Sequence, residues 1–144
     1  MQRGLEVGNE RKDDGRVAMT LKRVRLELAR NAQFPEGSSE HGYELVAPLT
    51  EDGHLDLEGW KQHRSSCTVR RFWTGGEEAY GHLVHHAGGR WAFRYQSTAA
   101  DDEEPIFRLD RHSFVVGEYV SITENDGVQR TFRVVSVGPA GAPA

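Results

Sequence analysis

Two Gly-Gly pairs divide the stretch from residue 67 to residue 95 into three apolar runs, which read CTVRRFW, EEAYGHLVHH and RWAFRY. Glycine adopts positive φ angles without steric cost, and tight β-hairpin turns require such angles. Short apolar runs between turn residues are typical of β-strands. The stretch therefore predicts a three-stranded antiparallel meander that turns at Gly75-Gly76 and at Gly88-Gly89.

Two-residue turns at these glycines would fix which residues face each other. Tyr95 would lie opposite His82, and Cys67 would lie opposite Val84. Both turns then give the same apolar face, as a consistent register requires. That face would carry Cys67, Val69, Trp73, Tyr80, Val84, Trp91, Phe93 and Tyr95, with His82 and His86 among them.

Strand patterns continue on both sides of the meander. Residues 21–28 alternate apolar with charged side chains, which predicts a strand with one buried face. Shorter strands are expected at residues 43–48 and 106–109, and residues 31–41 and 97–105 are expected to be loops. A helix capped by Asp56 is predicted from Leu57 to about His63, where it would cover an open end of the sheet.

The last predicted hairpin joins residues 118–123 to residues 130–137. A two-residue Asp126-Gly127 loop would mix apolar and polar side chains on each face. A three-residue loop that includes Asn125 instead places Val120 opposite Phe132 and gives one apolar face. We therefore predict the longer loop, with Gly127 left-handed in a bulge.

Together these segments predict a mainly β protein: a small antiparallel barrel or strongly bent sheet of seven to eight strands with one short helix. A disordered tail is expected at residues 1–19, a single β-rich domain at 20–138 and a short flexible tail at 139–144. The net charge of -4 gives no electrostatic footprint for duplex DNA. No apolar run is long enough to span a membrane, and the single cysteine allows no intramolecular disulfide, so a cytoplasmic protein is expected.

Three segments carry a resemblance to a known group of proteins: HGYELVAPLTEDGHLDLEGW, CTVRRFW, and GEYVSITENDG with TFRVVSV. Across residues 21–137 the chain resembles a family of small, uncharacterised bacterial proteins. That family has no assigned activity, so the resemblance implies no function. The last hairpin is also similar to the terminal hairpin of PUA-like and ASCH-type barrels, and this resemblance implies binding of RNA or nucleotides.

One candidate ligand site follows from the predicted register. Cys67 would lie diagonally between His82 and His86, with Tyr95 on the same face, and His63 could approach from the helix. A thiolate and imidazoles can hold zinc or act as a catalytic pair. The alternative interpretation is that Cys67 and His82 are packed core residues, because the spacing matches no zinc-site pattern. His85 would point the other way, into solvent.

A second candidate is a nucleic-acid surface. Arg70, Arg90 and Arg94 interleave with aromatic residues, and sheets that bind single strands combine these residue types. The predicted register turns the aromatic residues inward, however, and leaves only the arginines on the outer face. The acidic run Asp101, Asp102, Glu103 and Glu104 could attract a cation, but it is more typical of a solvated loop.

The sequence contains no Ser-His-Asp set, acid pair or cofactor fingerprint that can be placed within mutual reach, and no cofactor is predicted. We therefore expect a non-catalytic binding or interaction module whose partner is a small molecule or another protein. Binding of single-stranded RNA or a nucleotide is the first alternative, and a small metal- or ligand-dependent enzyme that uses Cys67 and His82 is the second. An open polar cavity at His82 would favour a ligand or an enzyme, whereas a filled barrel would favour binding at the surface.

Overall fold

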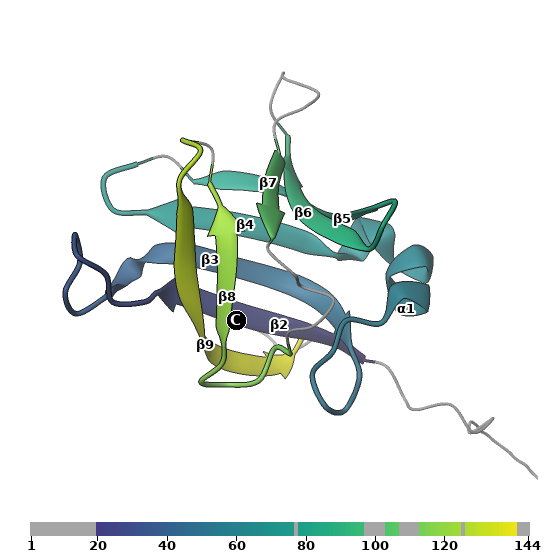
Figure 1. The fold of residues 1–144 in the computed structure, drawn as a ribbon. Helices are drawn as coiled ribbons and strands as arrows, with labels where there is room; N and C mark the ends of the chain where they lie inside the picture. The colour runs from purple at the N-terminus through teal and green to yellow at the C-terminus, as the bar shows by residue number, and fades with distance from the viewer. Residues whose placement is uncertain (1–19, 77, 97–102, 107–112, 125, 141–144) are drawn as a thin grey trace, which may run out of the picture.

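The fold is a closed antiparallel β-barrel, seen in a computed structural model that describes residues 20–76, 78–96, 103–106, 113–124 and 126–140. In these residues the strands are β2 (Thr20–Leu28), β3 (Ser38–Leu49), β4 (Thr68–Trp73), β5 (Ala79–His86), β6 (Arg90–Tyr95), β7 (Glu103–Ile106), β8 (Tyr119–Thr123) and β9 (Gln129–Pro139). Each strand pairs with the next along the chain, and β9 returns to β2 to close the barrel (Figure 1). The predicted mainly β class, with a barrel and one short α-helix, is confirmed. The predicted N-terminal tail and most of the acidic loop lie outside the described residues.

The core fills the inside of the barrel. In β2 the inward residues Val24, Leu26 and Leu28 are buried, as their alternation with charged residues predicts. From the other strands the largest fully buried side chains include Tyr43, Phe93, Phe132, Leu45, Leu83 and Ile122. Aromatic rings meet near the centre, where the Tyr43 ring lies 5.2 Å from Phe93 and 5.1 Å from Phe132. The barrel is therefore packed with side chains rather than hollow along this length.

The strand β3 is twice as long as the sequence pattern indicated, because it begins at Ser38 and not at Tyr43. Its pairing with β2 is interrupted: Glu27 pairs with Gly42, but the next residue, Leu28, pairs with Ser38. Residues 39–41 therefore bulge out of the ladder. Such bulges bend a strand and increase its twist. This one lies at the end of the segment 31–41 that was predicted as a loop, so that prediction is wrong for residues 38–41.

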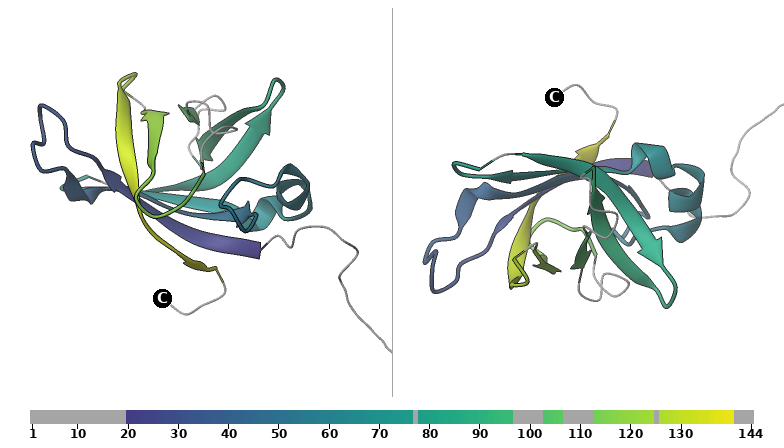
Figure 2. Two further views of the ribbon diagram at one scale, coloured as in Figure 1. Left: turned by 60° about the horizontal axis from the view of Figure 1, so that its bottom comes forward. Right: turned by 90° about the horizontal axis from the view of Figure 1, so that it is seen from above.

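The short helix α1 (Leu57–Gln62) and a 3₁₀ turn η1 (Arg64–Ser66) lie at the end of the sheet far from the connection between β2 and β3 (Figures 1 and 2). Trp60 is buried, and its indole Nε1 donates a 2.8 Å hydrogen bond to the carbonyl oxygen of Leu83. The predicted helix is confirmed. Asp56 occupies the N-cap position, but its side chain makes no capping hydrogen bond within the described structure. Neither described helix is long and apolar enough to cross a membrane.

The last hairpin has the predicted register. Val120 lies opposite Phe132, and both are buried. The backbone N–H of Glu124 donates to the carbonyl oxygen of Val128, which leaves the predicted three-residue loop between them. Gly127 has φ +82°, so its left-handed conformation is confirmed.

The predicted register of the central meander is wrong by one residue in both hairpins. Gly81, not His82, lies opposite Tyr95 and Val69. The second connection has three residues instead of two, because His86 pairs with Arg90 and Ala87 joins the two glycines in the turn. A slip of one residue turns every side chain of a strand to the other face.

The true register of β5 brings different residues inside. Leu83 is buried in the core, whereas His82 and Val84 belong to the outer face and Tyr80 is 53% exposed. His85, predicted to be solvated, is half-buried, with its ring 4.6 Å from the ring of Trp91. Gly81 takes an inward position at which a side chain cannot fit: an added Cβ would lie 2.0 Å from the carbonyl oxygen of Arg94.

Candidate functional site

A network of polar side chains crosses the barrel at one end of the core. Tyr43 and Arg71 are cross-strand partners on β3 and β4, and both point inward. The hydroxyl of Tyr43 lies 2.9 Å from Glu104 Oε1 and 2.6 Å from Glu124 Oε2. Tyr95 completes the chain, since its hydroxyl donates to the same Glu104 oxygen at 2.6 Å. Side chains from β3, β6, β7 and the end of β8 are thus joined through one row of oxygens.

Glu124 also contacts the basic side chains at this end of the barrel. His41 Nε2 lies 3.1 Å from its Oε1, and Arg130 Nη1 donates to the same oxygen at 2.9 Å. Arg71 Nε donates to the other oxygen at 3.2 Å. Trp73 covers this group, with its ring centroid 3.9 Å from the ring of His41 and 4.7 Å from the Arg71 guanidinium carbon.

The pKa values of Glu104 and Glu124 are shifted in opposite directions, although neither side chain has exposed surface. Burial raises the pKa of Glu104 above its usual value, because the lowering effects of Tyr95 and Arg71 do not outweigh it. Burial also raises the pKa of Glu124, but the hydrogen bonds from His41 and Tyr43 and the charge of Arg71 outweigh it, so that this pKa lies below its usual value. A buried network of this kind is costly to assemble and is either a device for a unique fold or a functional centre.

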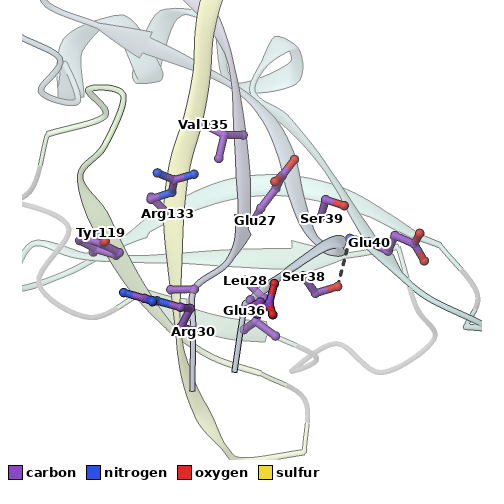
Figure 3. A pocket seen from close by; sticks show the side chains of 12 residues that line it. Glu27, Leu28, Arg30, Glu36, Ser38, Ser39, Glu40, Tyr119, Arg133 and Val135 are labelled. Carbon is purple, nitrogen blue, oxygen red and sulfur yellow. Dashed lines mark hydrogen bonds between the residues drawn. The ribbon is translucent and has the colours of Figure 1, made fainter. Parts of the chain in front are cut away.

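A groove on the outside of the barrel is the second candidate. It holds about 960 Å³ between the connection of β2 to β3 and the outer side of β8 and β9 (Figure 3). Its lining consists of Glu27, Leu28, Ala29, Arg30, Glu36, Gly37, Ser38, Ser39, Glu40, Tyr119, Arg133 and Val135. A smaller hollow of about 350 Å³ adjoins it and shares Arg30.

The groove exists because two irregularities in the strands meet there. One is the bulge of residues 39–41 on β3. The other is on β9, where Val134 and Ser136 pair with consecutive residues of β2 and Val135 is left over. Both bulges contribute residues to the lining. Bulges are common beside functional sites, because they turn the backbone away from its ladder.

The two sides of the groove carry opposite charges. Arg133 and Tyr119 are cross-strand partners on one side, with Arg30 near them, and Tyr119 is 54% exposed. Neither Arg30 nor Arg133 makes a side-chain hydrogen bond or ion pair with another described residue. Figure 3 shows Glu36 and Glu40 on the opposite side.

The acidic side differs from the basic one in how its charges are compensated. Glu27 is neutralised by Arg25, whose Nε donates to it at 2.7 Å. Glu36 has no ion-pair partner in the described residues, and Glu40 accepts a hydrogen bond only from Thr74 there. Within the described part of the chain, two carboxylates without an ion-pair partner therefore face two guanidinium groups without one.

The structure does not bring the predicted Cys67 and His82 site together. Thr68, and not Val69 as predicted, pairs with His82, so His82 shares the outer face with Thr68 while Cys67 points into the core. Cys67 is fully buried, and burial raises the pKa of its thiol to about 11. His86 lies on the outer face too, where its Nε2 is 2.8 Å from Glu103 Oε1.

The other members of that prediction are dispersed as well. His63 is exposed beyond the end of α1. Among the described residues no group of three or more His, Cys, Asp or Glu side chains is arranged to hold a metal ion. Of the predicted ligand-binding residues, Tyr95 does reach an interior polar site, because its hydroxyl donates to Glu104.

The arginines of the predicted nucleic-acid surface do lie on the outside but are occupied. Arg70 is paired with Glu44 and Glu78, and Arg94 is paired with Glu103. Arg90 Nε donates to the carbonyl oxygen of Ala87 within its own turn. Of the acidic run, residues 101 and 102 are not described, and its last two members diverge, Glu103 outward and Glu104 inward.

Comparison with protein-family models, with curated protein sequences and with solved structures finds no match for this chain. Sequence reasoning also missed both centres that the structure shows. One local signal was available for the network. Glu104 is two residues from Ile106, and residues two apart on a strand point to the same face, so Glu104 shares the face of a buried apolar residue. The groove had no comparable signal, because its position depends on two bulges.

Proposed function

We propose that this protein is a binding module that takes an extended polypeptide segment of mixed charge into the groove beside β9. The observation that carries the proposal is the arrangement of opposite charges across that groove, which have no ion-pair partners among the residues that the structure describes: Arg30 and Arg133 on one side, Glu36 and Glu40 on the other. Charged groups placed in this way give specificity and speed association more than they add affinity.

The filled barrel supports binding on the outside. Leu26, Tyr43, Phe93 and Phe132 occupy its interior and have no exposed surface. The volume of about 960 Å³ lies within the range of ligand sites in proteins. Tyr119 adds an exposed aromatic platform beside Arg133, and aromatic and arginine side chains are enriched in binding hot spots.

A polypeptide fits the charges of the groove better than a nucleic acid does. A phosphate backbone offers one sign of charge, so Glu36 and Glu40 would repel it as strongly as Arg30 and Arg133 attract it. A peptide offers both signs. It also offers backbone donors and acceptors to the bulge of β3, where residues 39–41 have left the β2 ladder.

The test uses four defined probes with the isotope-labelled protein. They are an extended peptide in which Glu, Thr, Lys and Val alternate, a poly-lysine peptide, a poly-glutamate peptide and an oligouridylate. We expect the mixed-charge peptide to shift the backbone NMR signals of Ser39, Glu40, Tyr119 and Arg133. The homopolymers should shift them less at equal concentration.

Charge reversal then locates the site. Arg133→Glu should weaken binding of the mixed-charge peptide at least severalfold. Arg90→Glu is the matched control, because Arg90 is exposed at the β5–β6 turn and does not line the groove, so binding should persist. Equal loss in both variants, or no shift at the groove with any peptide, would refute the proposal. Binding of oligouridylate that depends on Arg133 would replace it with an RNA-binding function.

A further inference from the structure

Glu27, which lines the groove, lies within reach of two arginines and binds only one of them. It is directly opposite Arg133 in the β2–β9 ladder, and both side chains point outward, because their neighbours Leu28 and Phe132 are buried. Side chains paired in this way have Cβ atoms about 4.5–5.5 Å apart, close enough for an ion pair. The carboxylate nevertheless points away from Arg133 (Figure 3) and accepts a 2.7 Å hydrogen bond from Nε of Arg25, two residues away on its own strand.

Arg25 has an advantage over Arg133 in this competition, because its guanidinium group is already held in place. Its Nη1 donates to Glu44 at 3.0 Å, and its Nη2 donates to the carbonyl oxygen of Ser39 at 3.0 Å. The guanidinium carbon lies 4.4 Å from the centre of the Phe72 ring. A side chain that other contacts have ordered loses little further entropy when it binds one more carboxylate. The exposed Arg133 would have to be ordered for that bond alone.

Arg25 does not line the groove, but two of the groups that it binds, Glu27 and the backbone of Ser39, do line it. We propose that Arg25 is a positioning residue which, by holding Glu27, keeps Arg133 free to receive a carboxylate of the bound segment; this rests on the function proposed above. The segment must therefore carry an acidic side chain where it passes Arg133.

Loss of the Arg25 charge should send Glu27 across to Arg133. The carboxylate would lose the one ion-pair partner that it has among the described residues, and an unpaired guanidinium group lies directly opposite. The new pair within the protein would then compete with a carboxylate of the ligand. Because exposed ion pairs are weak, the expected loss of affinity is about two- to fivefold.

The first experiment uses the full chain without a ligand, so it does not depend on the proposed function. Phenylglyoxal modifies guanidinium groups, and mass spectrometry gives the rate for each arginine. We expect Arg133 and Arg30 to react rapidly in the unmodified chain. In Arg25→Met, Arg133 should react several times more slowly, while Arg30 keeps its rate as an internal control. An Arg133 that reacts slowly in the unmodified chain, or equally fast in the variant, would overturn the proposal.

A double variant separates positioning from a merely structural role. In Arg25→Met/Glu27→Gln no carboxylate is left at position 27, so the rate of Arg133 should return to that of the unmodified chain. Arg70→Met is the matched control, because Arg70 is on the same outer face and pairs with carboxylates outside the groove, and Arg133 should then keep its rate. If the double variant stays slow, Arg25 acts through Ser39 and the bulge instead, and the proposal is wrong.

The single variant Glu27→Gln decides the matter even if Arg25→Met does not fold. Because Glu27 is bonded to Arg25 and not to Arg133, its replacement should leave the rate of Arg133 unchanged. A faster reaction of Arg133 in this variant would show that Glu27 had been paired with it in solution, which would overturn the proposal.

Peptide binding then tests what Arg133 receives. The mixed-charge peptide should bind Arg25→Met about two- to fivefold more weakly than the unmodified chain, and should bind the double variant normally. With Gln in place of every Glu of the peptide, the three proteins should bind alike. Equal binding of the original peptide by all three, or a difference that persists with the Gln peptide, would overturn the proposal. If the unmodified chain binds neither peptide, the proposed function fails, and the rates of Arg133 still decide whether Arg25 keeps it free.

Discussion

Gly81 lies where the barrel leaves almost no room for a side chain, and Gly81→Ala tests the register of the meander. An added Cβ would lie 2.0 Å from the carbonyl oxygen of Arg94, whereas an ordinary contact is 3.4 Å or more. The obstacle is backbone of β6, paired with β5 on either side of this point, so it cannot rotate away. The two strands would have to separate by more than 1 Å at this point.

The size of the effect can be estimated from two opposing contributions. Overpacking of a filled core costs about 1–3 kcal/mol and occasionally more. Replacement of glycine by alanine lowers the entropy of the unfolded chain and returns roughly 0.4–1 kcal/mol. Because the contact is with backbone, we expect the upper part of the overpacking range and a net loss of about 2 kcal/mol. A domain of this size then melts about 8 °C lower.

Equilibrium unfolding in urea, followed by tryptophan fluorescence, measures this loss, since Trp60 and Trp91 are buried in the core. Gly138→Ala is the matched control: Gly138 lies in β9, and an added Cβ there meets no atom within 4 Å. This variant should be as stable as the parent or slightly more stable. If Gly81→Ala were no less stable than Gly138→Ala, Gly81 would not face the interior and the described register would be wrong.

Three further outcomes follow from single sites. Gly127→Val should lower the free energy of unfolding by about 1 kcal/mol or more, because Gly127 has φ +82° and a β-branched residue is strained there; an unchanged urea midpoint would contradict the three-residue loop. The pKa of Glu124 is lower in the folded state, so its contribution to stability is present above the unfolded value of about 4.3 and is lost as the pH falls through the folded value. Glu124→Gln should therefore flatten the acid side of the curve of stability against pH, and an unaltered slope below pH 4 would refute this. Cys67 is fully buried and the pKa of its thiol is raised to about 11, so iodoacetamide should label it only after unfolding; rapid labelling of the native protein, seen by mass spectrometry, would contradict its position.

The two kinds of hairpin show which parts of the fold a sequence can specify. In the last hairpin only one loop length gives a single apolar face, so Val120 and Phe132 could be paired correctly. The run HLVHH in β5 is less restrictive, since Leu83 or Val84 could supply the apolar face. The decisive fact is spatial: the backbone of β6 approaches position 81 so closely that only glycine fits.

The interior network was hidden for a related reason. In the sequence Glu103 and Glu104 belong to a run of four acidic residues, which is typical of a solvated loop. The structure separates them, because neighbouring residues of a strand point to opposite faces. Glu104 accepts from the hydroxyl of Tyr95 on the neighbouring strand β6 and contacts the hydroxyl of Tyr43 on β3, which is 61 residues away in the chain. Partners at such sequence separations cannot be read from local pattern.

The pairing of β9 with β2 sets the order in which this chain can fold. Every other strand pairing in the described residues joins neighbours along the sequence, and most of these pairings need only a short loop to close. Lys22 pairs with Pro139, so the closing contact spans nearly the whole domain. Closing a loop of that length from the open chain costs roughly 4 kcal/mol of entropy, whereas preformed hairpins shorten the effective loop. We therefore expect the meander to assemble first and the β2–β9 ladder to form late, so that stabilising changes in this ladder slow unfolding more than they speed folding.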